Sequence, residues 1–64
     1  MKKQKFNGEI WKVGDEVRLK DKRFKSTAKI EMFYSDVKNG VRLDSELDGF
    51  YSWNLADLEK VEKQ

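Results

Sequence analysis

Turn dipeptides divide this chain into short segments, and this division constrains its fold more than any other feature. Each of the four glycines lies in such a pair: Asn7-Gly8, Gly14-Asp15, Asn39-Gly40 and Asp48-Gly49. Asparagine, aspartate and glycine tolerate the positive φ angles that tight hairpin turns require. Between the turns, apolar and polar residues alternate as they do in half-buried strands. The sequence therefore predicts an all-β domain.

Two segments show this alternation most clearly. In "VGDEVRLK" the alternation places Val17 and Leu19 inward, against Arg18 and Lys20. In "TAKIEMFY", residues 27–34, it places the inward and outward sets as follows: Ala28, Ile30, Met32 and Tyr34 inward, and Thr27, Lys29, Glu31 and Phe33 outward. We expect Asn39-Gly40 to form a type I′ turn that joins this strand to "VRLD", residues 41–44. A second turn, "SELDG", then leads into a fourth strand, "FYSWN".

The last part of the chain carries a signal for one helical turn. Asn54 stands three residues before Asp57, which is the outline of an N-cap. Leu55 and Leu58 fall on one side of such a turn, and Val61 continues inward in a last strand. The predicted core consists of Val17, Leu19, Ala28, Ile30, Met32, Val41, Leu43, Trp53, Leu55, Leu58 and Val61.

The opening "VGDEVRLK" and the closing "WNLADLEKV" resemble those of SH3-like small barrels of the KOW or Tudor-like kind, over roughly residues 11 to 62. The resemblance implies an all-β, five-stranded SH3-like barrel with one helical turn before the last strand. KOW motifs have a glycine soon after the first strand, where this chain has "KSTAKI". We assign the barrel to residues 11–64, preceded by a flexible or loosely docked basic arm, residues 1–10.

The chain contains neither histidine nor cysteine, the residues that most often act as general bases, nucleophiles and zinc ligands. Its barrel also resembles that of the type II dihydrofolate reductases, through Gly14, Asp15, Val17 and Arg18, then Ala56, Leu58 and Glu59. That family acts through a Val-Gln-Ile-Tyr-Pro segment, where this chain has "FYSWN". The resemblance therefore implies the fold and not the activity, and we expect no enzyme and no cofactor.

The acidic segment "DSELDG" has the spacing of the first half of an EF-hand calcium loop. The twelfth loop position falls on Leu55, where a bidentate glutamate is required. We therefore interpret the segment as an acidic turn and expect no metal.

Charge divides the chain into two halves. Residues 1–30 carry a net charge of +6 and residues 31–64 one of −4, so a polyanion could contact only one face. The candidate nucleic-acid site is a basic loop of Lys20, Lys22, Arg23 and Lys25, assisted by Lys2, Lys3, Lys5 and Lys12 of the arm. Such lysines neutralise phosphates without reading sequence. The alternative is a basic loop that is simply solvated.

Aromatic residues give the second candidate site. Tyr51 and Trp53 alternate with Phe50 and Ser52 along "FYSWN", so this strand cannot bury all three rings in one core. We expect Trp53 to be buried and Phe50 to lie outside beside Phe33. The candidate partner-binding face consists of Phe33, Tyr34, Phe50 and Tyr51. Alternatively, Phe6 or Ile10 of the arm could cover this patch.

These observations favour a small non-catalytic binding module that mediates protein interaction, with weak, sequence-independent nucleic-acid binding as the alternative. The partner would be another protein or a second copy, because 64 residues without cysteine form only a small, marginally stable core. No apolar stretch marks a signal peptide or a membrane span, so we expect a cytoplasmic protein with no membrane partner and no small-molecule substrate. Its size and charge density suit an accessory protein of a phage or mobile element.

Overall fold

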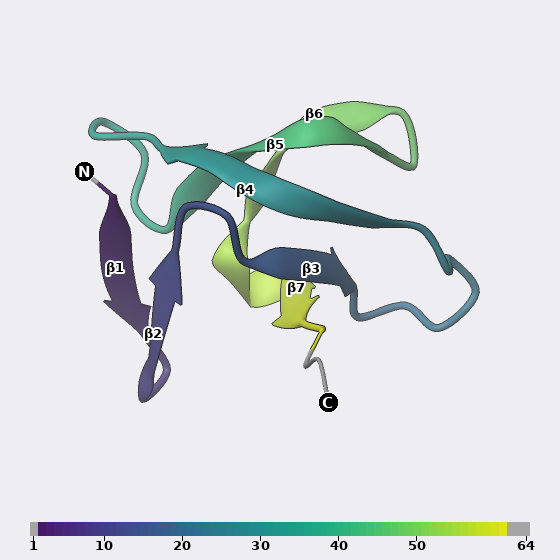
Figure 1. Cartoon of the computed structure of the whole chain (residues 1–64), viewed down its shortest axis with the longest axis horizontal. Helices are drawn as coiled ribbons and strands as arrows, with labels where there is room; N and C mark the ends of the chain where they lie inside the picture. The colour runs from purple at the N-terminus through teal and green to yellow at the C-terminus, as the bar shows by residue number, and fades with distance from the viewer. Residues whose placement is uncertain (1, 62–64) are drawn as a thin grey trace.

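The computed structural model describes residues 2–61, which form seven strands and one 3-10 turn (Figure 1). A two-stranded sheet pairs β1 with β2, and a five-stranded antiparallel sheet has the order β6-β5-β4-β3-β7. The elements are β1 (Lys3–Phe6), β2 (Glu9–Lys12), β3 (Glu16–Leu19), β4 (Thr27–Phe33), β5 (Gly40–Leu47), β6 (Phe50–Asn54), η1 (Leu55–Asp57) and β7 (Leu58–Lys60). The larger sheet curls around the long β4 into a half-barrel. The predicted all-β class, with one helical turn before the last strand, is confirmed.

A β-bulge in β4 changes which side chains enter the core. Ile30 pairs with Leu43, but Met32 already pairs with Arg42, so β4 carries one extra residue at this point. The extra residue reverses the alternation beyond Ile30. Phe33 is therefore buried, with 3% of its surface exposed, while Met32 is 41% exposed. The predictions that Met32 lies in the core and Phe33 on the outer face are wrong.

The turns differ from those expected at Asn39-Gly40 and in "SELDG". Residues 34–39 all lie between β4 and β5, and only Asn39 of the Asn39-Gly40 pair has a positive φ. The predicted two-residue type I′ turn is therefore wrong at this position. Asp48 and Gly49, with φ of 51° and 84°, form the predicted turn, but it consists of these two residues alone. Residues 45–47 belong to β5, so that strand is longer than the sequence indicated.

The N-terminal segment forms a regular hairpin, where the sequence indicated a flexible or loosely docked arm. β1 and β2 pair around Asn7 and Gly8, both at positive φ. Trp11 of β2 enters the core with 3% of its surface exposed, and Phe6 packs against the core beside it. The boundary that we placed between residues 10 and 11 thus falls within β2.

The helical turn closes the half-barrel as expected. The Asn54 side chain accepts a hydrogen bond of 2.9 Å from the Ala56 amide, which confirms the predicted N-cap. Leu55, the first residue of η1, and Leu58, which follows η1, are both buried, and β7 pairs with β3. The observed core consists of Trp11, Val17, Leu19, Ala28, Ile30, Phe33, Val41, Leu43, Leu47, Leu55 and Leu58. Trp53 and Val61, which we expected there, are only half-buried.

Candidate functional site

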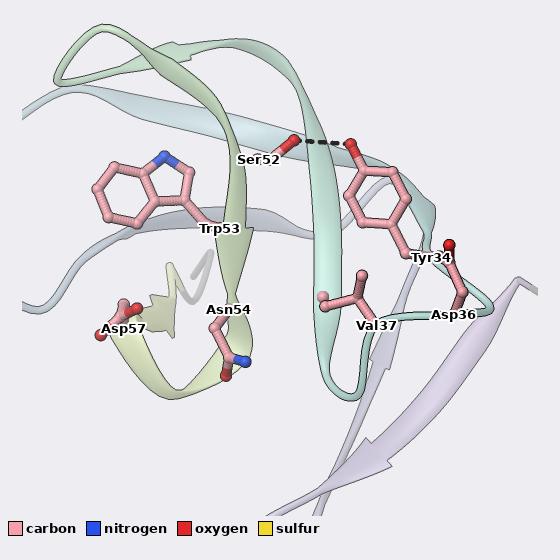
Figure 2. A pocket seen from close by; sticks show the side chains of 8 residues that line it. Tyr34, Asp36, Val37, Ser52, Trp53, Asn54 and Asp57 are labelled. Carbon is pink, nitrogen blue, oxygen red and sulfur yellow. Dashed lines mark hydrogen bonds between the residues drawn. The ribbon is translucent and has the colours of Figure 1, made fainter.

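A groove of about 500 Å³ lies along β6, the edge strand of the five-stranded sheet. The loop between β4 and β5, the first residue of β5, β6 and η1 all contribute to its lining. The lining residues are Tyr34, Asp36, Val37, Gly40, Ser52, Trp53, Asn54 and Asp57. In Figure 2, Trp53 and Asp57 lie on one side of β6, and Tyr34 and Val37 lie on the other. The groove therefore spans β6, an edge strand that pairs with β5 alone.

Two hydrogen bonds fix the aromatic walls of the groove. The Tyr34 hydroxyl and the Ser52 hydroxyl are 2.7 Å apart, which ties the end of β4 to β6 across β5 (Figure 2). The Trp53 indole N–H donates to the Phe50 carbonyl at 3.0 Å, so its ring lies back along β6. The Phe50 ring meets the Trp53 ring edge-on, with centroids 6.1 Å apart. Both walls are thus positioned before any partner arrives.

Gly40 allows the loop after β4 to fold over the start of β5. A Cβ atom at Gly40 would lie 2.7 Å from Val37 Cγ1, 3.0 Å from Val37 Cβ and 3.3 Å from Tyr34 Cδ2. The Gly40 amide donates to the Val37 carbonyl, and the Tyr34 amide donates to the Gly40 carbonyl. Gly40 is therefore needed for close approach, which places Val37 beside Tyr34.

We expect Gly40→Ala to displace Val37 and to destabilise the domain by about 1 to 3 kcal/mol, the usual cost of overpacking. Urea unfolding measures the cost, and amide NMR shifts of residues 34–40 report the displacement. The double variant Gly40→Ala/Val37→Ala removes the clashing Val37 Cγ1 atom and should recover part of the loss. Equal stability of Gly40→Ala and the unaltered protein would contradict this role for Gly40.

Two carboxylates in the groove have no charged partner. Within residues 2–61, neither Asp36 nor Asp57 forms an ion pair or a side-chain hydrogen bond. Asp57 lies beside Trp53, and Asp36 lies beside Tyr34 and Val37 (Figure 2). Negative charge therefore flanks both aromatic walls.

A second hollow, of about 370 Å³, adjoins the groove at Trp53 and Asp57, which line both. It extends the site toward the β3–β4 loop, where Phe24 is half-buried against the core. Its other lining residues are Leu19, Lys20, Asp21, Arg23 and Asp48. The two hollows together form a longer site centred on Trp53.

The candidate aromatic face is only partly assembled. Phe33 is buried, so it cannot pair with Phe50 on the surface. Phe50 is 63% exposed, and Tyr51, 39% exposed, lies under the Arg42 guanidinium at 4.7 Å from the ring centroid. Tyr34 lines the groove. The arm does not bury Phe50, since Phe6 packs beside Trp11 instead.

The candidate basic loop is partly neutralised within the fold. Arg23 hydrogen-bonds to Asp21 and lowers the pKa of that carboxyl from 3.8 to about 2. Lys22 donates to Glu59, which lowers the Glu59 pKa, and Arg18 contributes from 3.1 Å. Lys20 and Lys25 are exposed. The loop and the β1–β2 hairpin lie at opposite ends of the molecule in Figure 1, so the two basic clusters do not form one face.

Sequence reasoning missed Asp36, Val37, Trp53 and Asp57 as site residues. Asp36 and Val37 lie in the loop between β4 and β5. We expected a two-residue turn at Asn39-Gly40, so the sequence analysis did not consider this loop. Trp53 was assigned to the core because of its size. The sequence did carry one signal for Asp57. Asn54 caps the helical turn that contains Asp57, and this cap fixes the position of Asp57 relative to β6.

No family model, curated protein or solved structure matches this chain. Among residues 2–61, no group of three or more metal-ligating side chains could hold an ion. No helix in this described part of the chain is long and apolar enough to cross a membrane. The groove and the exposed surfaces are therefore the features from which a function is inferred.

Proposed function

We propose that this protein is a non-catalytic binding module that takes an extended, basic segment of a partner protein into the groove along β6. The observation that carries this proposal is the combination of aromatic walls at Tyr34 and Trp53 with the unpaired carboxylates Asp36 and Asp57 beside an edge strand. The groove replaces the predicted face of Phe33, Tyr34, Phe50 and Tyr51, of which it retains Tyr34.

An edge strand favours an extended peptide as the occupant. β6 pairs with β5 on one side only, and an unpaired strand edge is a template for a further strand. In such β-augmentation, main-chain hydrogen bonds supply affinity, and pockets for alternate side chains supply specificity. Trp53 and the adjoining hollow at Phe24 offer such pockets.

Charge favours a basic segment. Asp36 and Asp57 are joined in the extended site by Asp48, which forms no ion pair within 4.0 Å in residues 2–61 but interacts electrostatically with Arg23. A lysine or arginine of the partner would complement these carboxylates, and its aliphatic stem could pack on the Trp53 ring. Lys20 and Arg23 also line the adjoining hollow, where Arg23 is paired with Asp21. Aromatic residues such as Trp53 are enriched in interface centres.

The order β6-β5-β4-β3-β7, with a 3-10 turn before the last strand, supports an SH3-like barrel of the KOW or Tudor-like kind. A cytoplasmic location and a role as an accessory protein of a phage or mobile element are part of the same proposal. They follow from the small size, the charge density and the sequence expectation alone.

A randomised 12-residue peptide display library tests the proposed function. We expect enriched peptides to carry lysine or arginine next to apolar residues. Calorimetry with an enriched peptide should show a loss of about thirtyfold for Trp53→Ala, the size typical of an interface hot spot. Asp57→Asn should cause a smaller loss that disappears at high salt.

Met32→Ala is the matched control, because Met32 is an exposed apolar side chain that does not line the groove. Circular dichroism shows whether each variant remains folded. Peptides that bind Trp53→Ala and Asp57→Asn as tightly as the unaltered protein would place the site elsewhere. A library with no enriched sequence would refute the proposal.

A further inference from the structure

The outer face of the β1–β2 hairpin concentrates lysines. Glu31 of β4 lines a hollow with Lys3 and Lys12, but its carboxylate is paired with Arg42. Lys3 and Lys12 are direct cross-strand partners, and Lys5 pairs with Ile10. Directly opposed residues of an antiparallel pair share a face, so all four side chains lie on the same side of the ribbon. The other side, with Phe6 and Trp11, packs against the core.

Like charges directly opposite each other destabilise a strand pair, yet this fold retains Lys3 opposite Lys12. Within residues 2–61, no carboxylate forms an ion pair with Lys3, Lys5 or Lys12. By contrast, Lys22 and Arg23 of the β3–β4 loop already contact carboxylates. An anion on the outer face would relieve the repulsion between the hairpin lysines.

We propose that the outer face of the β1–β2 hairpin, where Lys3 and Lys12 oppose each other beside Lys5, binds the phosphate backbone of double-stranded DNA. Two residues along a strand span about 7 Å, and about four phosphate charges lie along 7 Å of duplex. Three lysines on this length would neutralise most of that charge. A two-stranded ribbon also has a width that the major groove of B-form DNA admits.

The composition of this face favours DNA over the other polyanionic surfaces. Membrane-surface elements insert tryptophan, phenylalanine or leucine between their basic residues, whereas Phe6 and Trp11 of this hairpin turn inward. Ile10, 53% exposed, is the apolar side chain among the lysines of this face. Double-stranded RNA has a deep, narrow major groove that such a ribbon does not enter. Lysines act as point charges, so binding is independent of base sequence.

Fluorescence anisotropy with a labelled 20-base-pair DNA duplex tests this inference on the full chain. We expect binding with a log-log salt slope of about −3, as three phosphate contacts imply. The triple variant Lys3→Gln/Lys5→Gln/Lys12→Gln should lose at least about tenfold in affinity at 50 mM salt and reduce the slope to near zero. Its thermal midpoint should not fall, because the substitutions remove a repulsion.

The triple variant Lys20→Gln/Lys22→Gln/Lys25→Gln is the matched control, because it removes the same charge from the opposite end of the molecule. It should keep most of the affinity. Loss of binding in the loop variant alone would overturn the proposal in favour of the loop. Hairpin-dependent binding to phosphatidylserine vesicles but not to the duplex would overturn it in favour of a membrane. Because the hairpin variant alters no residue of the groove or of the adjoining hollow, its effect on DNA binding is independent of the peptide experiment.

Discussion

Phe33→Ala is expected to destabilise the protein by about 3 to 5 kcal/mol. A buried phenylalanine contributes about 3 to 5 kcal/mol relative to alanine, and Phe33 is 3% exposed in the core. A domain of this size has a total stability of about 3 to 10 kcal/mol, at 0.05 to 0.15 kcal/mol per residue. The substitution therefore removes a large part of the free energy of unfolding.

Urea unfolding followed by tryptophan fluorescence measures this effect, with Met32→Ala as the control in the neighbouring position. Met32 is 41% exposed, so its truncation should cost about 0.5 kcal/mol or less, as is usual for surface positions. The bulge in β4 is responsible for this contrast. If Met32→Ala destabilised the protein more than Phe33→Ala, β4 would follow the unbroken alternation and the bulge would be wrong.

The contrast between these two residues shows what strand periodicity can and cannot predict. Alternation correctly placed Val17, Leu19 and Ile30 in the core, because β3 and the first half of β4 are regular. A bulge adds one residue to one strand and reverses every later position. The residues around Glu31 carry no glycine or proline that would signal it, so the burial of Phe33 depends on pairing with β5.

The turns show a similar limit. Asp48-Gly49 and Asn7-Gly8 adopt the positive φ angles that their residue types favour. Asn39-Gly40 has the same chemistry, but Gly40 serves close packing against Val37 and belongs to β5. Local turn preference could not distinguish these two uses of glycine. The loop between β4 and β5, which the turn preference did not predict, supplies Asp36 and Val37 to the groove.

The sequence predicted that exposed aromatic side chains would form the candidate site, but it did not predict which of them line the groove. The sequence indicated that the strand "FYSWN" could not bury all its rings, and Phe50 and Tyr51 are indeed exposed. Which ring lines a groove depends on the hydrogen bond from the Trp53 indole to the Phe50 carbonyl. That contact arises from the side-chain rotamer, which the sequence pattern does not determine.

Trp11→Ala is expected to destabilise the domain by about 3 to 5 kcal/mol, the usual cost of truncating a buried aromatic residue. Trp11 is 3% exposed, its indole N–H donates to the Phe6 carbonyl, and its ring packs edge-on against Phe6 at 6.4 Å. The Lys60 ammonium of β7 lies 5.7 Å from the Trp11 ring centroid and donates to the Ile10 carbonyl at 2.9 Å. The hairpin is thus part of the folded unit, and its loss would open the core beside β7.

Thermal unfolding followed by far-ultraviolet circular dichroism is the appropriate measurement, because the substitution removes one of the two tryptophans. Ile10→Ala is the control: Ile10 is adjacent in β2 but 53% exposed on the opposite face, and its truncation should cost about 0.5 kcal/mol or less. If residues 1–10 were instead a loosely docked arm, as their sequence suggested, separating the hairpin from the core would cost little. Nearly equal midpoints for Trp11→Ala and Ile10→Ala would therefore support the arm, whereas a large difference establishes that β2 contributes an anchor to the core.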